Sequence, residues 1–315
     1  MQRATVARDR LPVEAGRRSQ RYRPGVRGTG ILMVLPVVLL VAVFTLYPFG
    51  QALYDSMRLT SPFFPARFVG LDNFRGVIGS TYFADAVRVT LTFTAIAVPA
   101  TVVTSLLIAL LLNERFVGNT ALRAGMLLPW ALPASITGIV WKWMFLDSWG
   151  AINVGLYELG VIDKYITWLT SPRLAMMAVV IAFVWAQTPL ATALLLVAVQ
   201  GVPQDLYAAA SLDGAAATGR FRDITLPIIR PTLVIVALYQ VLMAFTTFDI
   251  TYALTHGGPG TATTMLTYFT WAESFKMLDF GRGASLAILV ALSSIVVIVV
   301  LLRAMPKDAL LEEAR

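Results

Sequence analysis

The sequence predicts an all-α integral membrane protein, and three observations support that prediction. Hydrophobic residues make up 57% of the 315-residue chain and charged residues only 14%, whereas ordinary soluble domains are about a quarter charged. Six long apolar segments recur along the chain. A polar, alanine-rich stretch at residues 201–231 separates the fourth segment from the fifth. Because the bilayer core offers no water to the backbone, the apolar segments must be helices.

Each apolar segment is close to the roughly 20 residues that a helix needs to cross about 30 Å of hydrocarbon. The third segment, which contains MLLPWALPASITGIVW, is the least regular, and we expect it to bend. Together the segments form one membrane domain over residues 30–303, between an N-terminal arm (1–29) and a tail (304–315). The predicted spans are residues 30–54, 89–112, 124–145, 174–200, 232–254 and 283–302.

The distribution of Lys and Arg predicts the orientation. With both termini in the cytoplasm, 16 of the 25 basic residues lie on the cytoplasmic side, as the positive-inside rule requires. Eight of them are arginines in the arm, which lacks apolar periodicity and is expected to lie near anionic lipid. The apolar run after the arm is too long for a signal peptide. Topology therefore explains the net charge of +7, and nucleic-acid binding is not needed to explain it.

The stretch at 201–231 is predicted to form two short amphipathic helices outside the hydrocarbon. Pro203 suits the first turn of a helix. Gly214 can end that helix with a left-handed backbone. Asp213 can accept hydrogen bonds from free N–H groups of the following turn. Pro227 is expected to stop the second helix.

This stretch resembles the EAA loop of binding-protein-dependent ABC importer permeases. The pattern of that loop is E-A-A-x-x-D-G-A, then five residues, then F-x-x-I-x-L-P. Two positions depart from it: Ala208 stands where the pattern has Glu, and Thr218 stands where carbohydrate-type members often carry Trp. Whether the missing glutamate alters coupling to an ATPase stays open. The residues in register are Ala209, Ala210, Asp213, Gly214, Ala215, Phe221, Ile224, Leu226 and Pro227.

Three further stretches resemble the carbohydrate-uptake branch of these permeases, in particular the maltose-type first permease subunit. They are FVGLDNF, LLPWALPASITGIVWKWMF and FDITYALTHGGPGTATTMLTYFTW. The resemblance implies six transmembrane helices of the ABC importer permease type with cytoplasmic coupling helices, in a prokaryotic cytoplasmic membrane. It also implies that the chain lies in the lipid bilayer and assembles with four partner subunits. These are a second, non-identical permease, two ATPase subunits and an extracytoplasmic binding protein. The sugar stays open among disaccharides, monosaccharides, and glycerol-3-phosphate or its diesters.

The chain itself lacks the residues for ATP hydrolysis. None of its four lysines follows Gly and precedes Ser or Thr, as a phosphate-binding loop requires. The chain has no Cys, and His256 is its one histidine, so a thiolate or histidine metal cluster is excluded. We therefore expect no enzyme activity and no cofactor in this chain, with ATP and Mg²⁺ bound by the partner ATPase.

An alternative function is an ion-coupled secondary transporter for a small polar solute. Such transporters place ionisable groups inside their spans. Here Asp249 is the one acidic residue and Lys142 the one basic residue inside the predicted spans, and both lie near outer ends. A non-transporting scaffold is disfavoured because the connections are too short for a sensing domain.

A sugar path should combine hydrogen-bonding and aromatic side chains shielded from lipid. Such residues cluster halfway along the fourth span and recur along one side of the fifth. The alternative for the Gln and Thr residues among them is hydrogen bonding between neighbouring helices. The candidates are Trp185, Gln187, Thr188, Tyr239, Gln240, Met243 and Thr247.

Overall fold

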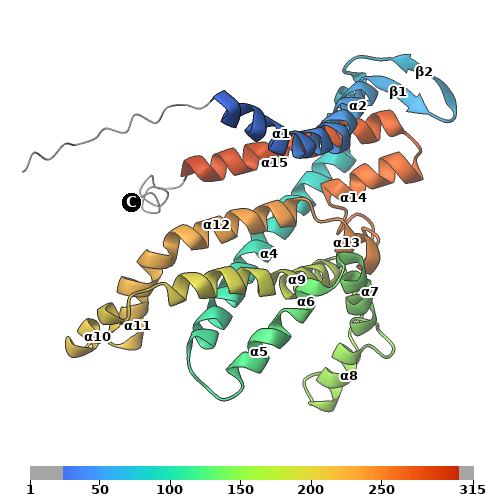
Figure 1. Ribbon diagram of the computed structural model, residues 1–315. Helices are drawn as coiled ribbons and strands as arrows, with labels where there is room; N and C mark the ends of the chain where they lie inside the picture. The colour runs from blue at the N-terminus through green and yellow to red at the C-terminus, as the bar shows by residue number, and fades with distance from the viewer. Residues whose placement is uncertain (1–23, 305–315) are drawn as a thin grey trace, which may run out of the picture. The chain divides into compact units, whose positions relative to one another are not determined.

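The computed structural model describes residues 24–304, coloured in Figure 1. The predicted tail, apart from residue 304, lies outside the described residues, as do residues 1–23 of the predicted arm. The chain divides into two compact units, residues 1–51 and 52–315. Helix α1 (Pro24–Val41) continues through a π-turn (η1, Ala42–Leu46) into α2 (Tyr47–Ser56), whose residues 52–56 are counted with the second unit. The helix therefore begins inside the predicted arm.

Within residues 24–304, five helices are long and apolar enough to cross a membrane, and a bent helix pair makes a sixth candidate span. This confirms the predicted class, a helical membrane protein. The first span does not bury its own apolar window. In chain order the spans are Ile31–Ser56, Thr81–Asn113, Asn119–Ala131 with Ala134–Met144, Pro172–Gln200, Ala217–Phe245 and Phe280–Arg303.

The second and fourth spans, α4 (Thr81–Asn113) and α9 (Pro172–Gln200), form the centre of the second unit. Ser80 caps α4 by accepting a hydrogen bond from the Phe83 N–H at 3.2 Å, so this helix starts eight residues before the predicted span. Both helices contribute buried alanines to the apolar clusters between them, and small side chains let helix backbones approach closely. Phe93 and Phe183 meet edge to face, with ring centroids 5.2 Å apart.

The third span is broken, as its prolines predict. Helices α5 (Asn119–Met126) and α6 (Leu128–Ala131) meet α7 (Ala134–Met144) at 100°. Leu132 is extended (ψ 137°) because the following Pro133 ring disfavours a helical residue before it. Beyond the bend α7 packs against α13 (Asp249–Leu254). Gly138 allows that contact, since an added Cβ would lie 2.7 Å from the Cβ of Ala253.

The fifth span differs from its prediction at both ends. It is continuous from α11 (Ala217–Arg220) through a π-turn (η2, Phe221–Thr225) into α12 (Leu226–Phe245). It ends at Phe245 and not at residue 254, and the Thr246 and Thr247 hydroxyls donate to backbone carbonyls four residues earlier. The chain leaves the helix there, and α13 follows as a separate element.

The remaining elements connect the spans. They include a two-stranded antiparallel hairpin that the all-α prediction did not foresee. Asn73 holds the hairpin root by donating to the carbonyls of Ser56 and Arg58, each at 2.8 Å. The last span, α15 (Phe280–Ala304), also packs against the hairpin. The connecting elements are β1 (Arg58–Ser61), β2 (Phe64–Phe68), α3 (Asp72–Ile78), α8 (Ala151–Glu158), α14 (Leu266–Trp271) and η3 (Ala272–Lys276).

Candidate functional site: the coupling segment and the membrane cavity

The residues that resemble the EAA loop lie at one end of the helices of the second unit. Helix α10 (Gln204–Leu212) follows α9 after a short turn, and α11 then begins the fifth span. Figure 1 shows α10 and α11 together at one end of α9 and α12, with α13 at the other end. We call residues 203–227 the coupling segment. The rest of the chain covers little of its first helix, α10, since no residue of α10 is buried.

A Schellman motif ends α10, and Gly214 makes it possible. Gly214 has φ +78°, the left-handed conformation predicted for it. The Ala215 N–H donates to the carbonyl of Ala210 at 2.9 Å, and the Gly214 N–H donates to that of Ser211 at 3.2 Å. Together these bonds satisfy two carbonyls that the helix end would leave free.

Two local predictions for this segment are wrong. The Asp213 side chain does not cap the next helix: α11 starts after Ala216 without a side-chain cap. Pro227 does not stop a second short helix. It follows a π-turn in which the Leu226 N–H reaches back five residues to the carbonyl of Phe221. The wider turn accommodates a residue without an N–H, so the helix continues into the membrane.

The pattern residues divide between an exposed side and an inward side. Ala209, Asp213, Gly214 and Pro227 are exposed. Ile224 instead packs onto an apolar cluster at the root of the segment, formed by Val199, Val202 and Ile229. The remaining pattern residues, Ala210, Ala215, Phe221 and Leu226, are half-buried.

Two leucines outside the pattern extend the exposed side of α10. The exposed fraction is 43% for Leu206 and 91% for Leu212. An apolar surface on an otherwise polar connection is suited to contact another protein.

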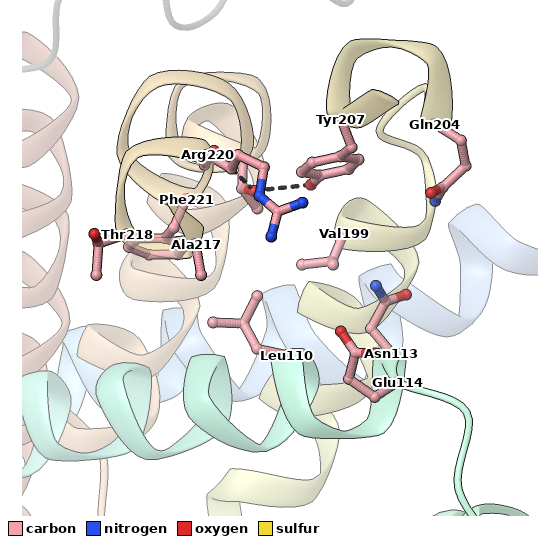
Figure 2. Close-up of a pocket in the computed structure, with 11 residues that line it drawn as sticks. Leu110, Asn113, Glu114, Val199, Gln204, Tyr207, Ala217, Thr218, Arg220 and Phe221 are labelled. Atoms are coloured by element: carbon pink, nitrogen blue, oxygen red, sulfur yellow. Dashed lines mark hydrogen bonds between the residues drawn. The ribbon is translucent and has the colours of Figure 1, made fainter. Parts of the chain in front are cut away.

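A polar cavity of about 530 Å³ lies between α10 and the ends of α4 and α9 (Figure 2). Tyr207 and Arg220 both line it in Figure 2, and the dashed line from Tyr207 marks a 2.8 Å bond between its hydroxyl and Thr225 Oγ1. The sequence reasoning missed both residues because they lie between the pattern positions. A usable signal was present: Tyr207 and Ser211 are four residues apart and therefore share a face of α10. The lining residues are Leu110, Asn113, Glu114, Val199, Gln204, Tyr207, Ala217, Thr218, Arg220, Phe221 and Thr225.

Two of the candidate sugar contacts, Trp185 and Thr188, share a second cavity of about 480 Å³. It lies between α4, the broken third span and α9, and Trp141 of α7 also lines it. The indoles of Trp141 and Trp185 meet edge to face, with centroids 5.8 Å apart. Within the described residues the Trp141 N–H and the Thr188 hydroxyl have no hydrogen-bond partner. None of the described residues that line this cavity is charged.

The candidates on α12 do not line that cavity. Gln240 is fully buried, and neither atom of its amide finds a partner in the described part of the chain. Met243 packs against the main apolar cluster, and Thr247 donates its hydroxyl to the Met243 carbonyl at 2.8 Å. Tyr239 is half-buried, as is Gln187 of α9. Trp185 and Thr188 therefore line one cavity that none of the candidates on or just after α12 lines.

Comparison with known proteins supports the resemblance to ABC importer permeases. Residues 101–305 match the model of the family "binding-protein-dependent transport system inner membrane component". The trehalose/maltose transport system permease protein MalF of Thermococcus litoralis is 40% identical over 261 residues, covering 82% of this chain and 88% of the relative. The sulfoquinovosyl glycerol transport system permease protein SmoG of Agrobacterium fabrum is 34% identical over 282 residues, covering 89% and 91%. The sn-glycerol-3-phosphate transport system permease protein UgpA of Yersinia pestis is 32% identical over 274 residues, covering 86% and 92%.

A solved structure shows the same fold. A chain of a bacterial alginate ABC transporter, crystallised with a periplasmic protein that holds an alginate pentasaccharide, matches with a TM-score of 0.77 at 20% identity. The match covers 88% of this chain and 93% of the other. The fold, the family match and the relatives decide against the ion-coupled alternative. The chain is a member of the family of binding-protein-dependent inner membrane components, the permease subunits of ABC importers.

Proposed function

We propose that this permease imports a neutral sugar or glycoside that an extracytoplasmic binding protein delivers. The family supplies the dependence on a binding protein, and the three relatives are named for trehalose or maltose, for a sugar glycoside and for a phosphorylated polyol. We choose among these three solute classes on one observation. It is the uncharged cavity of about 480 Å³ with Trp141, Trp185 and Thr188 in its wall. Its volume lies within the roughly 300–1,000 Å³ of typical ligand pockets.

The cavity chemistry favours an uncharged solute over a phosphorylated one. Indole faces stack on the C–H faces of sugar rings, and the wall of this cavity is almost wholly apolar. A phosphate buried there would need cationic partners, which the described lining residues do not supply. The path thus includes Trp185 and Thr188, while Gln187, Tyr239, Gln240, Met243 and Thr247 act in helix packing or at other stages of transport.

The energy is supplied by ATP that other subunits hydrolyse. We place two ATPase subunits at the cytoplasmic side, with α10 and its exposed Leu206 and Leu212 as the docking surface on this chain. A second, non-identical permease completes the membrane part. Both termini lie in the cytoplasm, because only that orientation places most basic residues inside.

The test uses the intact complex with its binding protein in nanodiscs. ATP hydrolysis is measured with trehalose, maltose, monosaccharides, sulfoquinovosyl glycerol and glycerol-3-phosphate. We expect stimulation by a neutral sugar or glycoside and loss of uptake in Trp185→Ala. Stimulation by sulfoquinovosyl glycerol or glycerol-3-phosphate alone, both of which are anionic, would contradict the choice of a neutral solute, and unchanged uptake in Trp185→Ala would remove this cavity from the path.

A further inference from the structure

Helix α10 has little to hold it in place by packing. None of its residues is buried, and a cavity of about 530 Å³ separates it from the ends of α4 and α9 (Figure 2). The residue of α10 that reaches the apolar cluster at the segment root is Tyr207. A helix that transmits force from an ATPase nevertheless has to be fixed to the span that it moves.

Four residues outside the family pattern provide that attachment through hydrogen bonds. The hydroxyls of Tyr207 and Thr225 lie 2.8 Å apart, and Thr225 is 4% exposed. Thr225 Oγ1 also lies 3.5 Å from the carbonyl oxygen of Arg220, and either hydroxyl of the Tyr207–Thr225 pair can be the donor.

A second pair of hydrogen bonds connects α10 to the start of the fifth span on the exposed side. Arg220 Nη1 donates to Ser211 Oγ at 2.9 Å, and Ser211 Oγ donates to the carbonyl of Tyr207 at 2.7 Å. Bonds therefore run from α10 to the start of the fifth span at two places, through Tyr207 and through Ser211. The π-turn at Phe221–Thr225 sets the position of Thr225 within this ring.

We propose that Tyr207, Ser211, Arg220 and Thr225 form a hydrogen-bonded clasp that makes α10 and the fifth span move as one body. Half-buried Tyr207 and buried Thr225 form its inner half, and they are positioning residues for energy coupling. The inference rests on the proposed function of the coupling segment. It differs from docking: the clasp faces the chain itself, whereas docking uses the exposed side of α10.

Paired substitutions isolate the hydroxyls. Tyr207→Phe keeps the ring on the apolar cluster and removes one hydroxyl, and Thr225→Val removes the other at nearly constant shape. The control is Thr218→Val, which deletes a hydroxyl from an exposed residue of α11 that lines the same cavity. Ser211→Ala opens the exposed half of the clasp.

The first measurement requires no ATPase. Since the chain has no Cys, spin labels at cysteines replacing the exposed residues Ala208 and Arg230 report the distance between α10 and α12 in the full chain. We expect one narrow distance distribution in the parent and in Thr218→Val, and a broadened one in Tyr207→Phe and Thr225→Val. The double variant should be no broader than either single variant, because both remove the same bond. An unchanged distribution in both single variants would overturn the clasp.

The second measurement is the ratio of ATP hydrolysed to sugar transported in the reconstituted complex. We expect Tyr207→Phe and Thr225→Val to retain the ATPase subunits and to raise this ratio about 2- to 10-fold, the range that follows from one net hydrogen bond. A normal ratio despite a broadened distribution would refute the role in coupling. If the parent chain itself bound no ATPase, the proposed function would fail, while the distance measurement would still decide the clasp.

Discussion

Gly214 offers the sharpest test of the coupling segment because its surroundings are empty. Its φ is +78°, and an added Cβ would meet nothing within 4 Å. A substitution there therefore changes the backbone energy and removes no contact. A left-handed backbone costs an ordinary L-residue roughly 1–2 kcal/mol, which lowers the fraction of correctly turned segment about 5- to 30-fold. Asn tolerates this conformation, and a β-branched Val tolerates it least.

We therefore expect the affinity for the ATPase to fall in the order Gly, Asn, Ala, Val at position 214. Gly214→Ala should bind the ATPase about 5- to 30-fold more weakly than the parent, and Gly214→Val should show no uptake. The assay is pull-down of the ATPase by each variant in nanodiscs, alongside uptake and ATP hydrolysis in the assembled complex. The matched control is Gly219→Ala, five residues later in α11, where an added Cβ also meets nothing within 4 Å and the backbone is helical. Equal affinity and uptake across the Gly214 series would refute the coupling role of this turn.

Three further predictions follow from the same structure. Asp213→Ala should leave the stability of the segment unchanged, since its carboxylate caps no helix; a thermal melt checks this, and a loss of ATPase binding alone would show that Asp213 touches the partner. Gln240→Leu should raise the thermal stability of the complex by about 1–3 kcal/mol, because it removes a buried amide that has no partner in the described chain; a lower melting temperature would show that water or a ligand satisfies that amide. Single cysteines at Ser61 and Ser148 should react with an impermeant maleimide in intact cells, whereas Thr218→Cys should react only after permeabilisation; external labelling at Thr218 would reverse the predicted orientation.

The local pattern of the sequence determined much of this protein. Hydrophobic runs long enough to cross a bilayer predicted the helical class. Each of the six regions contains helix in the structure, and five of the described helices are long and apolar enough to cross a membrane. Pro133 predicted the break in the third span, and Gly214 predicted the left-handed turn after α10. These features depend on the chain within one or two helical turns, so residue type and spacing are sufficient to predict them.

Element ends were harder to predict because hydrogen bonds that periodicity does not report decide them. Ser80 caps α4, which starts eight residues before the predicted span, whereas the fifth span ends at Phe245, nine residues before its predicted end. Pro227 was expected to stop a helix, but the π-turn before it allows the helix to continue.

Only the tertiary structure decided which polar residues of the spans meet one another. Trp185 and Gln240 are equally good candidates by sequence, yet Trp185 lines a cavity with Trp141 from another helix, while Gln240 is enclosed in the core. The clasp likewise joins Tyr207 to Thr225, residues 18 positions apart. The rotation of one helix against its neighbours sets such contacts, and sequence spacing within a single helix carries no information about it.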